Sequence, residues 1–102
     1  DPQALEFCSA VMREAQRIGA HLGCTIEGTP EDRHAVTRRL GAFKTSMLQD
    51  AEAGRAIELD ALVTVVRELA QRVNIETPAT DALLGLTRVF ARVHGLYPAA
   101  PA

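Results

Sequence analysis

The chain has 102 residues and a formal net charge of −2, from 11 basic and 13 acidic side chains. This length suits one domain with a single core. The scattered basic residues and the four Phe and Tyr rings, with no Trp, argue against a nucleic-acid surface, which needs a basic stripe and stacking rings. Because the chain opens with Asp1 and has no membrane-spanning run or signal peptide, we expect a piece of a longer soluble protein.

Two cysteines, Cys8 and Cys24, are too few for a disulfide framework. A helix between them would separate them by roughly 20 Å, which exceeds disulfide reach. We therefore expect a reducing, cytoplasmic setting, with Cys8 as a small core residue. No metal site is predicted, because the histidines lie far apart without ligand spacing. They are His21, His34 and His94.

The first predicted helix starts at Asp1 and Pro2, a cap followed by the residue favoured at the first helical position, and ends at Gly23. Steps of three and four residues predict its core-facing stripe. This stripe comprises Leu5, Cys8, Met12, Ala15, Gly19 and Leu22, widened by Val11 and Ile18. The residues expected to face water are Arg13, Glu14, Gln16 and Arg17. Glycine at position 19 indicates close helix packing or fraying of the helix end.

A connector follows, in which Ile26 is the one residue expected to be buried. The next helix start is T-P-E-D at residues 29–32, with Thr29 as the cap and acids in the first turn. Gly41 weakens the middle of residues 30–53. These residues therefore form either one kinked helix or two segments that meet within residues 41–44, and Gly54 ends the helical stretch.

A helix from about Glu58 has the clearest apolar periodicity in the chain. Its apolar positions are Leu59, Leu62, Val66, Leu69 and Val73. Thr77 is expected to cap a last helix that ends at Gly95. The apolar face predicted for that helix is Ala82, Leu83, Leu86, Val89, Phe90 and Val93. Residues 96–102 are expected to be a loose tail. No strand pattern is visible, so we predict an all-α bundle of four to five helices.

The central stretch, residues 44–62, reads K-T-S-M-L-Q-D-A-E-A-G-R-A-I-E-L-D-A-L. Its blocks S-M-L-Q-D, A-G-R and E-x-D-A-L resemble the signature of the C-terminal helical domain of ketopantoate reductases (2-dehydropantoate 2-reductases). The resemblance continues through residues 66–70 and 74–83 and is looser over 1–43. It implies the C-terminal domain of a 6-phosphogluconate-dehydrogenase-like reductase. Residues 1–102 contain no G-x-G-x-x-G loop after a strand, so the N-terminal dinucleotide-binding domain is expected outside this chain, and the fragment alone is expected to be inactive.

Glu58 is the predicted catalytic residue. An acid in the first turn of a helix is commonly there for stability alone, and without the resemblance this simpler interpretation would be preferred. In the family, however, the matching glutamate lines the active cleft and works with a lysine that donates a proton to the substrate carbonyl. That lysine is not Lys44 and belongs to a helix that this chain does not contain.

Ser46 and Asp50 are four residues apart and therefore share a helix face. The resemblance implies that Ser46 contacts the substrate carboxylate and that Asp50 lies in the same cleft; orienting Ser46 or capping backbone is an equally good interpretation of Asp50. Arg55 is a weak candidate for an anionic cofactor, since a turn arginine is more often solvated. Asp60 is expected to be structural or solvent-facing. Phe43 replaces a polar amide that helps bind substrate in some family members, which leaves the substrate open.

The resemblance implies an NADPH-dependent enzyme that reduces 2-dehydropantoate to pantoate, in pantothenate and coenzyme A biosynthesis. Its partners would be the 2-keto acid, its own nucleotide-binding domain and, over exposed apolar surface, a second copy in a homodimer. Two alternatives remain. One is a stand-alone helical module that dimerises or binds a partner helix, and the other is a paralogous reductase of another 2-keto or 2-hydroxy acid.

Overall fold

The computed structural model describes residues 1–41 and 44–98. Its helices are α1 (Pro2–His21), α2 (Pro30–Leu40), α3 (Ser46–Glu52), α4 (Val65–Arg72) and α5 (Pro78–Val93), with a π-helical segment η1 (Asp60–Thr64) before α4. These residues contain no strand, and the predicted all-α domain of four to five helices is confirmed. None of the helices in these ranges has the length and apolar character to cross a membrane.

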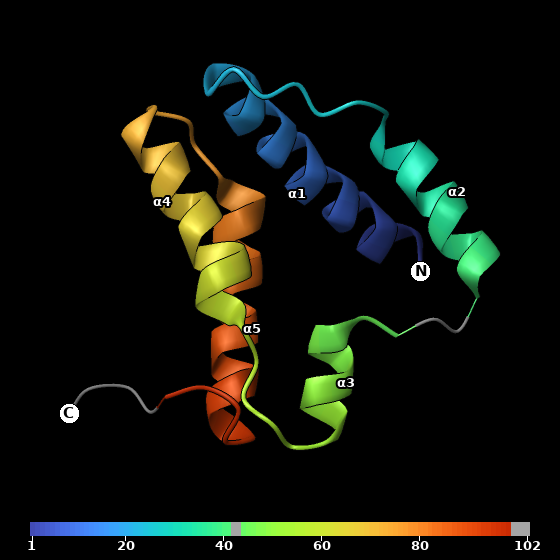
Figure 1. Ribbon diagram of the computed structural model, residues 1–102, viewed down its shortest axis with the longest axis vertical. Coiled ribbons are helices and arrows are strands. Elements are labelled where there is room, and N and C mark those ends of the chain that lie inside the picture. Colours follow the sequence, from blue (N-terminus) through green and yellow to red (C-terminus); the bar gives the residue numbers. More distant parts are fainter. Residues whose placement is uncertain (42–43, 99–102) are drawn as a thin grey trace.

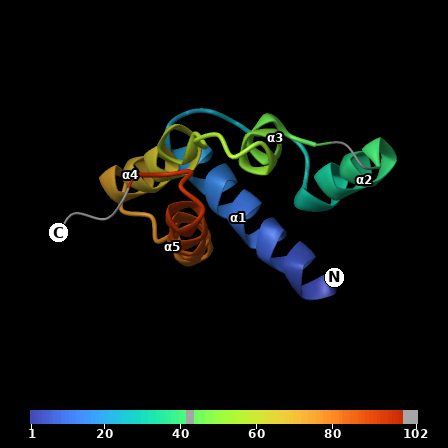
Figure 2. The same ribbon diagram turned by 90° about the horizontal axis from the view of Figure 1, so that it is seen from below.

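The helices pack around α1, which contacts α2 on one side and α4 and α5 on the other. Figures 1 and 2 show α4 and α5 side by side, with η1 continuing into α4, while α3 lies beside the last turns of α5 (Figure 1). The buried apolar residues come from α1, α4, α5 and the segments that flank them. They are Ile18, Leu59, Ala70, Leu84, Ala91 and Leu96. Helix α3 contributes no buried residue and is therefore held at the edge of the domain.

The buried face of α1 differs from the predicted stripe. Cys8 is exposed, and Leu5 and Leu22 are 37% and 47% exposed, so the prediction was wrong for these three residues. The residues of α1 that are buried are Ser9, Glu14, Ile18 and Gly19. Periodicity identified a helix but not the rotation at which its neighbours cover it.

Glu14 was predicted to face water and is instead 3% exposed. Its Oε1 accepts hydrogen bonds from the Thr80 amide at 2.8 Å and the Thr80 hydroxyl at 2.6 Å, and its Oε2 accepts from the Ala79 amide at 2.9 Å. Amide groups in the first turn of a helix have no partner within the helix, and a carboxylate suits them. Thr77 occupies the N-cap position, as predicted, but its side chain makes no capping bond. Glu14 of another helix therefore caps α5.

The connector after α1 folds back onto Gly19. The Cys24 amide donates to the Gly19 carbonyl at 2.7 Å, and a Cβ added at Gly19 would lie 2.8 Å from the Cys24 carbonyl oxygen and 3.2 Å from Cδ1 of Ile26. The close packing at Gly19 is therefore with this connector. The end of the Ile26 side chain lies against Gly19, but the residue is 50% exposed. The prediction that Ile26 is buried was therefore wrong.

Residues 30–53 form two helices. Thr29 and Asp32 exchange both bonds of a capping box at the start of α2, and α2 ends at Gly41, whose φ is 64°. Gly54, with a φ of 74°, follows the end of α3 as predicted. The kinked single helix is excluded, because Thr45 caps a new start. Phe43 lies outside the described residues.

The apolar face predicted for α5 is largely uncovered. The helix packs through Thr80, Leu84 and Ala91. The exposed apolar stripe, by contrast, consists of Leu86 (72% exposed), Val89 (62%), Phe90 (50%) and Val93 (75%). These residues lie on one apolar face, as predicted, and most of that face is exposed, since α1 and η1 cover the neighbouring face.

Residues 96 and 97 are not a loose tail. Gly95 turns the chain with a φ of 69°, Leu96 is 1% exposed, and its carbonyl accepts a hydrogen bond from the Ile57 amide at 3.0 Å. The Tyr97 hydroxyl donates to Asp60 Oδ1 at 2.7 Å. The segment after α5 therefore returns to the start of η1, where a buried leucine and two hydrogen bonds hold it.

Candidate active site

The stretch that carries the candidate residues consists of a short helix, a turn and the start of η1. Thr45 caps α3 by accepting from the Leu48 amide at 3.3 Å. Ser46 therefore occupies the first position of α3, and its side chain is exposed. Its hydroxyl is open to a ligand from outside the domain.

Asp50 lies one turn further along α3 and is partly buried. Its Oδ1 accepts from Nε of Arg55 at 3.1 Å, and its carbonyl accepts from the Arg55 amide at 2.8 Å. These two contacts close the turn that leaves α3. Arg55, the weak cofactor candidate, is thus placed against Asp50, with its side chain 64% exposed.

Glu58 precedes the helix that contains η1, and its carbonyl accepts from the Leu62 amide at 3.3 Å. Its side chain is exposed, and in residues 1–41 and 44–98 it makes no hydrogen bond or ion pair with another side chain. Its neighbours are fixed, because Ile57 bonds to Leu96 and Leu59 is 1% exposed. Glu58 therefore presents an unengaged carboxylate on an ordered backbone.

A small apolar hollow of about 250 Å³ lies between α3 and α5, next to the candidate residues. Its lining residues are Thr45, Met47, Leu48, Ala51, Ile57, Thr87 and Phe90. Direct neighbours of Ser46, Asp50 and Glu58 thus line this hollow, whereas those three side chains do not. The segments that carry the three candidate residues therefore meet at this hollow.

Asp60 and Tyr97 form a hydrogen-bonded pair beside Glu58. The hydroxyl of Tyr97 lowers the pKa of Asp60, and Thr64 adds a second hydrogen bond to the same oxygen at 2.8 Å. Reciprocally, the hydrogen bond to Asp60 raises the pKa of Tyr97. Asp60 therefore has a structural role, because it bonds to Tyr97 and Thr64. Of the two acids Glu58 and Asp60, Glu58 is the one whose carboxylate is available to a ligand.

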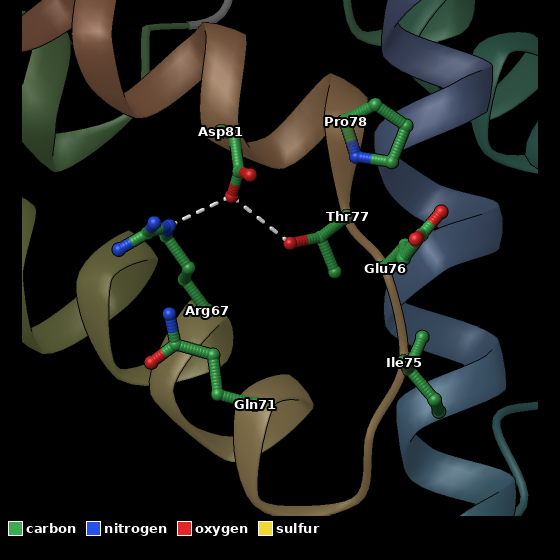
Figure 3. A pocket seen from close by; sticks show the side chains of 7 residues that line it. All are labelled: Arg67, Gln71, Ile75, Glu76, Thr77, Pro78 and Asp81. Carbon is green, nitrogen blue, oxygen red and sulfur yellow. Dashed lines mark hydrogen bonds and ion pairs between the residues drawn. The ribbon is translucent and has the colours of Figure 1, made fainter.

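A second pocket of about 390 Å³ lies at the opposite end of α4 and was not found from the sequence (Figure 3). Arg67 donates to Asp81 Oδ1 at 2.8 Å, and the Thr77 hydroxyl donates to the same oxygen at 3.0 Å. Figure 3 shows that Asp81 thus engages both Arg67 and Thr77, while no dashed line joins the polar side chains of Gln71 and Glu76 to these three. Arg67 and Asp81, which face each other across this pocket, are 14 residues apart. No local spacing in the sequence therefore indicates the pocket.

The described residues show no cradle for a dinucleotide or a metal. No group of three or more His, Cys, Asp or Glu side chains in this part of the chain could hold a metal ion. The elements there are all helical, whereas a dinucleotide pyrophosphate needs a glycine-rich turn between a strand and a helix.

The fold and these residues define an all-α domain in which a serine and a glutamate are exposed to solvent. Residues 1–91 match the family model described as ketopantoate reductase PanE/ApbA C terminal. The chain belongs to this family, which confirms the family predicted from residues 44–83.

Two relatives support this membership. The chain is 45% identical over 87 residues to a 2-dehydropantoate 2-reductase of Mesorhizobium japonicum, covering 85% of this chain and 27% of that protein. It also superimposes on the crystal structure of a proposed ketopantoate reductase from Ralstonia solanacearum MolK2, with a TM-score of 0.87 and 55% identity over 95% of this chain. It covers 29% of that structure. The chain therefore spans less than a third of either relative.

Proposed function

We propose that this chain is the substrate-binding helical domain of an NADPH-dependent 2-dehydropantoate 2-reductase, which reduces ketopantoate to pantoate in the cytoplasm, on the way to pantothenate and coenzyme A. The observation that carries the proposal is the match of residues 1–91 to the C-terminal family, together with the 45% identity to a relative of that name. The dinucleotide, which supplies the hydride, would bind to a part of the protein outside this chain.

Within this proposal Glu58 is the catalytic residue. An exposed carboxylate without a partner in the described residues can hold a cationic proton donor or accept a hydrogen bond from the substrate. The fixed backbone around it restricts where the carboxylate can lie, which is the condition for efficient positioning. The π-helical segment that begins two residues later fits this role. Such segments are rare in proteins, and those that occur are often found at functional sites.

Ser46 and Asp50 would act on the anionic end of the substrate. The exposed Ser46 hydroxyl can donate a hydrogen bond to the keto acid's carboxylate. Asp50 is already paired with Arg55 at 3.1 Å, so it would act by holding the guanidinium, which can meet an anionic substrate or cofactor. Glu58 can hold a cationic proton donor from the rest of the protein, and we expect this donor to be a lysine, which would also balance the acids around an anionic substrate.

The test is the rate of NADPH oxidation by the purified full-length protein with ketopantoate and with 2-keto acids of similar size that lack its hydroxymethyl group. The proposal predicts that kcat/KM is highest for ketopantoate, by about tenfold or more. Turnover of another acid with none of ketopantoate would establish the paralogous reductase instead. No NADPH oxidation with any of these acids would refute the proposed reductase activity.

An interaction role has one observation in its favour, the exposed stripe of α5 formed by Leu86, Val89, Phe90 and Val93. Exposed apolar stripes of this kind mark surfaces that another chain or domain covers. Sedimentation of the full-length protein distinguishes the two arrangements. If a second copy covers the stripe, the protein should be a dimer that Val89→Asp converts to monomer, whereas a parent protein that is already a monomer would exclude a second copy.

A further inference from the structure

The segment formed by residues 95–98, here called the return segment, runs back from the end of α5 to the chain that leads from α3 into η1 (Figure 1). The Leu96 amide donates to the Ala91 carbonyl at 2.7 Å, and the Leu96 carbonyl accepts from the Ile57 amide at 3.0 Å. The side chain of Leu96 is 1% exposed. Leu96 thus connects α5 to the residue immediately before Glu58.

Tyr97 makes the second connection. Its hydroxyl donates to Asp60 Oδ1 at 2.7 Å, and its ring lies 5.4 Å from the guanidinium carbon of Arg92, close enough for a cation–π contact. Arg92 also donates from Nε to the Pro98 carbonyl at 3.0 Å. The Tyr97 ring therefore contacts Arg92 of α5, and its hydroxyl binds Asp60.

These contacts bracket Glu58 without touching its carboxylate. Ile57 is fixed by the Leu96 carbonyl, Leu59 by burial at 1% exposure, and Asp60 by Tyr97. The return segment lies after residues 1–91, the part of the chain that the family model matches. Its contacts with Ile57 and Asp60 are therefore made from outside the residues that the family model matches.

We propose that the return segment sets the position of the Glu58 carboxylate, and that Tyr97 is a positioning residue acting through Asp60. The inference rests on the proposed function, in which Glu58 acts on the bound keto acid. A displacement of a reacting or orienting group by about 1 Å can lower the rate of a step by about 10²-fold. Loss of one of the two connections leaves the Leu96 contact in place, so a smaller effect is expected.

The first measurement compares the full-length protein with its Tyr97→Phe variant, which removes the hydroxyl and keeps the ring over Arg92. We expect kcat/KM for the keto acid to fall about tenfold, mainly through kcat. The matched control is Thr64→Val, which removes the other hydrogen bond to Asp60 Oδ1 without touching the return segment. Its kcat/KM should stay within about twofold of the parent. A Tyr97→Phe rate within twofold of the parent would overturn the inference.

The second measurement introduces Tyr97→Phe into a Glu58→Ala background. If Tyr97 acts through Glu58, the double variant should be no slower than Glu58→Ala alone. The same tenfold loss in both backgrounds would show a general structural effect and overturn the inference, while the proposed function would stand. A Glu58→Ala variant as fast as the parent would instead overturn the catalytic role on which the inference rests.

Hydrogen exchange provides a readout that does not depend on activity. In full-length Tyr97→Phe, the Ile57 amide should exchange several-fold faster than in Thr64→Val, because a loosened return segment exposes its hydrogen bond more often. Equal exchange in the two variants would show that Tyr97 does not hold this segment and would overturn the inference.

Discussion

Replacing Glu14 by Ala tests the contact that joins α1 to α5. The carboxylate accepts three hydrogen bonds of 2.6–2.9 Å from Ala79 and Thr80. Both Glu14 and Thr80 are nearly inaccessible, at 3% and 2% exposure. Alanine would leave these donors without an acceptor in a site that water reaches poorly, and we therefore expect one of the largest losses of stability in the chain.

The magnitude follows from the number and kind of these hydrogen bonds. A hydrogen bond to a charged group contributes roughly 1.5–3 kcal/mol, and an unsatisfied buried donor costs roughly 1–3 kcal/mol. The three bonds share one carboxylate and are not additive, and Ala79 is only partly buried. We expect the free energy of unfolding to fall by about 3–5 kcal/mol, a large fraction of the total for a domain. Glu14→Gln keeps one acceptor oxygen and should cost about 1–3 kcal/mol.

The assay is urea unfolding of the 102-residue chain, followed by far-ultraviolet circular dichroism. Glu14→Ala should shift the midpoint with little change in the slope. Arg13→Ala is the matched control, because Arg13 is the preceding residue and its side chain is 51% exposed in its ion pair with Glu31; it should have a much smaller effect. A Glu14→Ala loss below about 1 kcal/mol would refute the reasoning that this carboxylate caps α5.

Two further predictions concern packing and pH. Gly19→Ala should lower the free energy of unfolding by about 1–3 kcal/mol, because its Cβ would lie 2.8 Å from the Cys24 carbonyl oxygen. Gly85→Ala, where a Cβ meets nothing within 4 Å, should raise it by about 0.5–1 kcal/mol; thermal unfolding compares the two, and the opposite order would contradict the packing at Gly19. For the second, the hydrogen bond from Tyr97 lowers the pKa of Asp60 from 3.8, so the contribution of Asp60 to stability is present above about pH 4 and is lost as pH falls through the lowered pKa. The raised pKa of Tyr97, from 10.0, makes its contribution present below pH 10 and lost as pH rises through that pKa. The difference in Tm between the parent and Tyr97→Phe should therefore be largest between these limits, and a difference independent of pH would contradict the pairing.

Elements set by neighbouring residues could be predicted from the sequence. The Asp1 cap, the capping box of Thr29 and Asp32, and the stops at Gly54 and Gly95 each depend on contacts within a few residues. Local chemistry of this kind decides where a helix begins and ends. It accounts for the agreement on an all-α domain.

Features that depend on distant partners could not be predicted. Glu14 is buried against partners that lie 65 and 66 residues further along the chain. Tyr97 is held by an acid 37 residues away. The stripe of α5 has the periodicity of a core face, yet nothing in its own sequence says which surface covers it. These misassignments share one cause, since an amphipathic pattern does not reveal its partner.

The candidate site was only partly accessible to sequence reasoning. The spacing of Ser46 and Asp50 on one helix follows from the 3.6-residue period. The pairing of Asp50 with Arg55 and the fixed backbone around Glu58 required the structure. The resemblance predicted residue types and roles, whereas the exposure of Glu58 between the fixed residues Ile57 and Leu59 is visible only in the fold.

The most direct test of the proposed role of Glu58 is kcat/KM of full-length Glu58→Ala with the preferred keto acid and NADPH, measured beside Glu52→Ala. Glu52 is the nearest acid on α3, is exposed, and pairs with Lys44 at 2.6 Å, so its removal should change kcat/KM by less than about threefold. A catalytic Glu58 predicts a loss on the order of 10²-fold or more with the fold intact. A Glu58→Ala enzyme as fast as Glu52→Ala would show that Glu58 only stabilises the start of its helix, and would contradict the account.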